Sequence, residues 1–183
     1  MKNTIVITTL CTLLCFTGIL SCKKTTTTPP DPNEEELITT AKIAFTDSAG
    51  VQLPVEVVYK DLDGDGGNPP SQWDTIKLKP NTTYLAEIVL LNESGSPVDT
   101  ISNEVWDERT EHLFCFTIQG LNCTVIRTDT DGTYEVGLSS KWKTALAGTG
   151  TAQVVLRHQP DVKNGSCSPG STDLDITFPM KVE

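Results

Sequence analysis

The strongest local signal for chemistry is the segment DLDGDGG at residues 61–67. Carboxylates at alternate positions, followed by glycine, match the first half of an EF-hand loop, in which they point oxygen atoms at one Ca²⁺ ion. The twelfth position of such a loop is Gln72 instead of the usual glutamate. The segment therefore predicts either a Ca²⁺-binding loop with Asp61, Asp63 and Asp65 as ligands, or a metal-free turn rich in aspartate and glycine.

The chain has two histidines, His112 and His158, which lie in the alternating segments HLFCFTIQ and TAQVVLRH. Two imidazoles with nearby carboxylates suit Zn²⁺ or another transition ion, although Zn²⁺ is the less favoured ion for this chain. The alternative is that each histidine makes an ordinary hydrogen bond at the end of a strand. If successive strands alternate in direction, both histidines lie at the same pole of the domain as the 61–68 loop, Glu111, Asp129, Asp131 and Asp161.

Three cysteines follow the amino-terminal region: Cys115, Cys123 and Cys167. The segment HLFCFTIQGLNCTVI reads as a β-hairpin with its turn near Gly120. In such a hairpin Cys115 faces Cys123 across the strands, at a Cβ separation of about 5 Å. The sequence therefore predicts a Cys115–Cys123 disulfide and leaves Cys167 unpaired, the alternative being three free thiols.

No catalytic motif is present in the sequence. It holds neither a GxSxG nucleophile elbow nor an HExxH zinc motif, and its many carboxylates form no specific pair. These observations predict a protein that is not an enzyme.

Residues 1–21 read as a secretory signal peptide, with a positive start and a mostly apolar run over residues 5–20. The run ends in ILSC at 19–22, which resembles the lipobox of bacterial lipoproteins: a small residue precedes the cysteine that receives the lipid. The resemblance implies that Cys22 is lipidated. The alternative is an ordinary signal peptide that is cleaved elsewhere.

The predicted tether spans residues 22–36. Its KKTTTTPPDPNEEE stretch contains no apolar residue that a core would bury. Lys23 follows the lipidated cysteine, and in the lipoproteins that this region resembles a lysine there favours the outer membrane. We therefore expect a cell-envelope protein anchored in the outer membrane, periplasmic or surface-facing, with one folded domain over residues 37–183.

The charge balance restricts the partners. The chain carries 24 acidic and 14 basic residues, a formal net charge of −10. Nucleic-acid phosphates would be repelled by such a domain, so nucleic acid is excluded as a partner. Divalent cations and cationic ligands are the partners that an acidic field favours.

The elements that must position these residues are strands. Apolar residues alternate with polar ones in about nine segments, and turn residues such as DSAG, KPNT and NESGSP separate them. The pattern predicts an all-β fold, an antiparallel, Ig-like β-sandwich of about nine strands, with a barrel as the alternative. Ser102–Thr110 is the best candidate for a short helix.

Several segments together resemble a family of small cell-envelope lipoproteins of Bacteroidota, often labelled type 1 periplasmic binding fold proteins. They are NEEELITT, YKDLDGDGGN, NTTYLAEIVLLNE, DERTEHLFCF, TAQVVLRHQPD and STDLDITF. The resemblance covers most of residues 33–183 and implies a lipoprotein. The two-lobed α/β fold in that label needs crossover helices, which this sequence does not predict.

Two functions are consistent with these observations. The first is a non-catalytic, membrane-anchored module that binds a divalent cation or a small solute and serves an outer-membrane transporter. The second is a structural or adhesive module whose loop is stabilised by Ca²⁺ or by hydrogen bonds alone.

Overall fold

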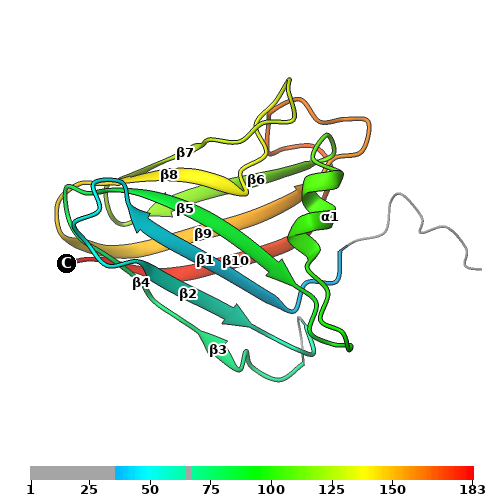
Figure 1. Cartoon of the computed structure of the whole chain (residues 1–183), viewed down its shortest axis with the longest axis horizontal. Helices are drawn as coiled ribbons and strands as arrows, with labels where there is room; N and C mark the ends of the chain where they lie inside the picture. The colour runs from blue at the N-terminus through cyan, green and yellow to red at the C-terminus, as the bar shows by residue number, and fades with distance from the viewer. Residues whose placement is uncertain (1–35, 65–66) are drawn as a thin grey trace, which may run out of the picture. The chain divides into compact units, whose positions relative to one another are not determined.

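Alternation of apolar and polar residues produces strands along almost the whole folded chain. The computed structural model describes residues 36–64 and 67–183, which belong to one compact unit, Pro32–Glu183. Within them lie ten strands and one short helix (Figure 1). The strands are β1 (Thr40–Asp47), β2 (Val55–Lys60), β3 (Gln72–Trp73), β4 (Ile76–Leu78), β5 (Thr83–Leu91), β6 (His112–Gln119), β7 (Cys123–Arg127), β8 (Ser139–Thr144), β9 (Gly148–His158) and β10 (Ser171–Val182).

The strands form two sheets packed face to face. One sheet has the order β3-β2-β1-β5-β8-β7 and the other β4-β10-β9-β6. Every pair is antiparallel except β4 with β10, which is parallel. The predicted all-β, mainly antiparallel sandwich is therefore confirmed. The segment WDTIKL is divided between the two sheets, because the chain crosses from one to the other after Asp74, whose carboxylate accepts a hydrogen bond from Val58 N–H at 2.9 Å.

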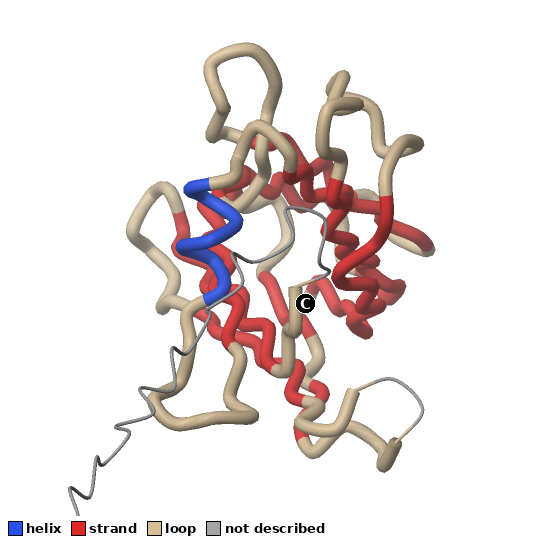
Figure 2. The backbone as a smooth tube through the Cα atoms, turned by 90° about the vertical axis from the view of Figure 1, so that its right-hand side faces the viewer, coloured by secondary structure: helices blue, strands red, loops and turns tan. Residues whose placement is uncertain are grey.

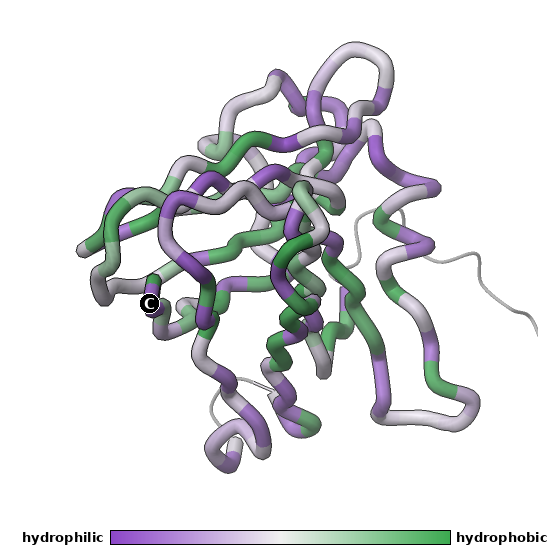
Figure 3. Tube along the Cα trace, turned by 60° about the vertical axis from the view of Figure 1, so that its left-hand side comes forward, coloured by the Kyte–Doolittle hydropathy of each residue, from purple (hydrophilic) through white to green (hydrophobic). Residues whose placement is uncertain are grey.

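The core fills the space between the two sheets. Its largest fully buried side chains include Trp142, Tyr84 and Phe45. The rings of Phe45 and Trp142 meet edge to face, with centroids 5.2 Å apart. Each such side chain contributes about 1.5–3 kcal/mol through burial. Figure 3 shows hydrophobic stretches along the strands and mostly hydrophilic loops at the strand ends.

The helix α1 (Ile101–Asp107) lies in the connection between β5 and β6, where the sequence predicts it. Ile101 and Val105 are buried, one turn apart, and attach the helix to the core. Figures 1 and 2 show α1 beside the strand ends, so its last turn can place side chains at that pole. Among the described residues, no helix has the length and apolar character needed to cross a membrane.

The disulfide joins Cys115 to Cys167, so the predicted Cys115–Cys123 pair is wrong. The reason is that β6 and β7 do not form a hairpin: β6 pairs with β9 in one sheet, and β7 pairs with β8 in the other. Cys123 therefore starts a strand in the opposite sheet. Among the described cysteines it is the free thiol, and burial raises its pKa to about 11.

The 159–170 loop, which follows β9, is held against the pole by three devices. Cys167 carries the disulfide to β6. Lys163 forms an ion pair with Asp131 at 2.7 Å, both side chains being almost fully buried, and also donates to the Arg109 carbonyl. The buried Gln159 amide donates to two carbonyls of the same loop. The loop is thus a fixed cover over the end of β9.

Candidate functional site

His112 and His158 lie side by side at the pole. His112 begins β6, His158 ends β9, and the two are cross-strand partners. Their rings are stacked, with centroids 4.7 Å apart and planes inclined by 8°. Both side chains are buried, at 0% and 2% exposure. The sequence prediction that both histidines lie at one pole therefore agrees with the structure. The two rings are closer together than a shared pole requires.

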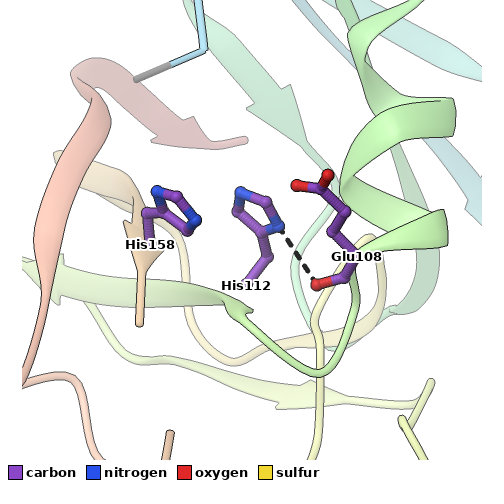
Figure 4. A group of neighbouring side chains, drawn as sticks. All are labelled: Glu108, His112 and His158. Carbon is purple, nitrogen blue, oxygen red and sulfur yellow. Dashed lines mark hydrogen bonds between the residues drawn. The ribbon is translucent and has the colours of Figure 1, made fainter. Parts of the chain in front are cut away.

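The backbone fixes the orientation of His112. Its Nδ1 lies 3.3 Å from the carbonyl oxygen of Glu108, in the turn that follows α1 (Figure 4). A carbonyl only accepts hydrogen bonds, so Nδ1 carries the proton. In the neutral ring Nε2 then holds a lone pair, and this nitrogen receives no hydrogen bond from the described residues. Such a second contact to a backbone carbonyl is typical of histidines that bind metals.

The Nε2 atom of His112 faces the carboxylate of Asp173 at 3.5 Å, with both side chains at 0% exposure. Strand alternation around Leu174 would turn Asp173 outward, because its neighbour faces the core. A β-bulge between Thr172 and Leu174 removes Asp173 from the pairing with β9. Bulges re-aim single side chains, often next to functional sites. Here the bulge places a carboxylate inside the sandwich.

Neither ring nitrogen of His158 and neither carboxylate oxygen of Asp173 makes a hydrogen bond within the described part of the chain. The nearest carboxylate to His158 is that of Glu111, with Oε2 3.7 Å from Nε2. Buried polar atoms in proteins are nearly always hydrogen-bonded, and unsatisfied ones cost about 1–3 kcal/mol each. Several such atoms together indicate that a bound group, and not a neighbouring side chain, satisfies them.

Additional carboxylates surround the histidines. The Glu108 side chain, His112 and His158 each offer a ligand atom, and the three atoms lie within 4.8 Å of one another (Figure 4). Glu36 is also part of this pole: burial, reinforced by Glu104, raises its pKa to about 7. The pole is therefore rich in negative charge on the side from which the chain enters the domain.

One distance at this pole matches the spacing of two metal ligands. Two ligand atoms bound at ~2.1 Å to a tetrahedral ion lie about 3.4 Å apart. The 3.5 Å between His112 Nε2 and Asp173 Oδ2 is close to this value. No family model, curated protein or solved structure matches this chain. The function of the site is therefore argued only from its own nitrogen and oxygen atoms.

The predicted Ca²⁺ loop has a different arrangement over its described residues. The Asp63 carboxylate accepts hydrogen bonds from the backbone and side chain of Asn68, at 2.9 and 2.7 Å, as in an aspartate turn. Those hydrogen bonds lower the pKa of Asp63. Asp61 is buried and lines a cavity that also contains Asp173. Asp65 lies outside the described residues, so the three-aspartate site stays a prediction.

Other predicted members of the pole have structural partners. Asp129 accepts hydrogen bonds from the backbone of Gly137 and Ser139, and Asp131 pairs with Lys163. Sequence reasoning missed Asp173, Glu108 and Glu36. The first is hidden by the bulge, the second stands beyond a short helix, and the third belongs to the segment predicted as tether.

Proposed function

We propose that this protein is a cell-envelope lipoprotein that binds a divalent transition ion, with Zn²⁺ as the best fit, in a non-catalytic site. The ligands are His112, His158 and Glu108, whose ligand atoms lie within 4.8 Å of one another, and Asp173 faces Nε2 of His112 at 3.5 Å. The observation that supports this most is the set of buried nitrogen and carboxylate atoms to which the described residues offer no hydrogen bond.

A cation would join the facing groups of this site. Nδ1 of His112 is directed at a carbonyl, so the lone pair on Nε2 of a neutral ring faces the Asp173 carboxylate. One divalent ion would bind both atoms and relieve their repulsion.

The ligand types favour a borderline ion over Ca²⁺. Ca²⁺ takes six to eight oxygen ligands, whereas imidazole nitrogens suit Zn²⁺ and its neighbours. The pole supplies two imidazoles and a buried carboxylate. We therefore place the ion at the histidines and not in the 61–68 loop.

The test is metal titration of the purified full-length chain in detergent, with Zn²⁺ by calorimetry and Co²⁺ by visible absorption. We expect one tight site, with a loss of at least about 100-fold in affinity in His158→Ala and of about 10–100-fold in Asp173→Asn, since changes next to the ligands cost 10–100-fold. The matched control is Asp175→Asn, an exposed carboxylate on the same strand, which should bind as the wild type does.

Two results would contradict the metal proposal. One is the absence of saturable Zn²⁺ and Co²⁺ binding by the wild-type chain. The other is Ca²⁺ binding that Asp63→Asn abolishes while His158→Ala retains it, because the ion would then lie in the acidic loop. Co²⁺ absorption also reports nitrogen ligation directly, so a structural effect of the histidine variant can be separated from loss of a ligand.

The proposed membrane anchor has its own test. The ILSC sequence at 19–22 supports lipidation of Cys22. We expect Cys22→Ala to abolish palmitate labelling and to release the protein from the membrane fraction, because a lipid chain provides the affinity for the bilayer. Cys123→Ala, which removes a cysteine distant from the lipobox, is the control. A Cys22→Ala protein that still labels and still pellets with membranes would disprove the anchor.

A further inference from the structure

A cavity of about 320 Å³ adjoins the carboxylate of Asp173 and is separate in its lining from the two histidines. It lies between the end of β2 and the start of β10. Two buried aspartates line it, the exposed Asp175 stands at its rim, and Ile38, Leu174 and Ile176 supply apolar surface. The lining residues that matter here are Ile38, Tyr59, Asp61, Asp173, Leu174 and Ile176.

The two carboxylates at this cavity are unusually poor in partners. Asp61 is 7% exposed, and its Oδ1 receives no hydrogen bond from any described residue. Its Oδ2 accepts a long hydrogen bond, 3.4 Å, from the Tyr59 hydroxyl, and the side chain also contacts that of Asp63. The Asp173 side chain is fully buried. Two buried carboxylates that share one cavity are costly unless a positive charge joins them.

The walls indicate what kind of cation fits. A bare divalent ion occupies a small part of 320 Å³ and needs four or more nitrogen or oxygen ligands at 2.0–2.6 Å. Ile38, Leu174 and Ile176 offer apolar surface instead. An alkylammonium ion matches both features: its N–H groups pair with carboxylates, and its carbon chain packs on aliphatic walls. The Tyr59 ring adds a surface that attracts cations.

We propose that this cavity binds a small organic cation of the alkylammonium type, held by Asp61 and Asp173 and covered by Ile38, Leu174 and Ile176. The cavity is a second site, distinct from the metal site, and the two share only Asp173. Asp61 belongs to the organic-cation site alone, so it is the residue through which the two sites are tested separately.

The experiment titrates n-butylammonium into the full-length chain in detergent, followed by calorimetry, with n-butanol as the neutral probe of similar shape. We expect saturable binding of n-butylammonium and at least about tenfold weaker binding of n-butanol, since a charge-assisted hydrogen bond contributes more than a tenfold factor. Asp61→Asn should weaken n-butylammonium binding by about tenfold or more on the same basis.

The control is Asp175→Asn, which removes the same charge from the rim of the same cavity. The Asp175 carboxylate accepts a hydrogen bond from Gln153 at 2.8 Å, so we expect its loss to leave binding within about twofold of the wild type. Asp61→Asn should also retain Co²⁺ binding, which separates this site from the metal site.

Three outcomes would overturn the proposal. The first is equal binding of n-butylammonium and n-butanol, or no saturable binding of either. The second is equal weakening by Asp61→Asn and Asp175→Asn, which would indicate diffuse charge attraction. The third is loss of Co²⁺ binding in Asp61→Asn but not in Asp175→Asn, which would make the cavity part of the metal site. The first outcome uses only the wild-type chain and does not depend on how the variants fold.

Discussion

Replacing both Cys115 and Cys167 with serine is expected to lower the free energy of unfolding by about 4 kcal/mol. The bond closes a loop between residues 52 positions apart, and a cross-link over a loop of that length removes about 4 kcal/mol of entropy from the unfolded chain. The guanidinium of Arg127 also donates toward Sγ of Cys167 at 3.4 Å, and this contact depends on the sulfur staying in place.

Urea denaturation, with and without reductant, measures this effect. The wild type should lose stability when reduced, whereas the double serine variant should not respond. Cys123→Ser is the control: its thiol is free and its pKa is raised to about 11 by burial, so the reductant response should persist. Peptide mapping that finds Cys115 bound to Cys123, or a wild-type midpoint that is indifferent to reductant, would refute the assignment.

Lys163→Met is expected to lower the free energy of unfolding by about 3 kcal/mol, the low end of the range for breaking a buried ion pair. The side chains of Lys163 and Asp131 are 3% and 4% exposed. Methionine keeps an unbranched side chain one heavy atom shorter, and it removes both the charge and the hydrogen bond to the Arg109 carbonyl. The Asp131 carboxylate then stays buried without its counter-charge, which is the costly part of the change.

The pH dependence of stability provides an independent measure of this ion pair. Burial alone raises the pKa of Asp131, but hydrogen bonds from Lys163, Tyr134 and Thr133 outweigh it, so the pKa lies below the ordinary 3.8. The stabilisation is therefore complete above about pH 4 and is lost as the pH falls through the folded-state pKa.

The control for Lys163→Met is the double variant Lys163→Met with Asp131→Leu. It leaves no charge unpaired and should recover much of the lost stability, because apolar replacements of buried ion pairs are often close to neutral. Thermal or urea unfolding of the wild type and the two variants at pH 7 and pH 3 measures both effects. If Lys163→Met unfolds at the wild-type midpoint at pH 7, the ion pair contributes nothing to stability.

Much of the fold follows from local sequence pattern. The alternation in segments such as HLFCFTIQ and TAQVVLRH predicts strands with His112 and His158 on core-facing sides, and the structure has both. Local pattern does not say which strands share a sheet. The Cys115–Cys123 prediction failed for that reason, since a hairpin and a crossing between sheets have the same sequence signature around Gly120.

The site was predicted only in part. The two histidines can be placed at one pole from the order of the strands. The position of Asp173 depends on a β-bulge, which turns a side chain to the other side of the sheet and leaves no signal in the alternation of the sequence. Glu36 follows a stretch that is polar throughout, so composition assigns it to the tether. Its raised pKa depends on burial and on the charges of Glu104 and Glu108, which are remote in sequence. Such pairings are set by tertiary structure, which periodicity does not encode.

The position of Glu36 beside the histidines has a consequence for where the proposed ion would be released. The chain enters the domain at this pole, and Glu36 lies fourteen positions after Cys22. Fully extended, such a chain spans about 50 Å at most. With an anchor at Cys22, the pole and its ion would stay within that distance of the bilayer surface. An ion released there would meet a neighbouring membrane protein at the high effective concentration of a tethered donor, without first diffusing through the bulk solution.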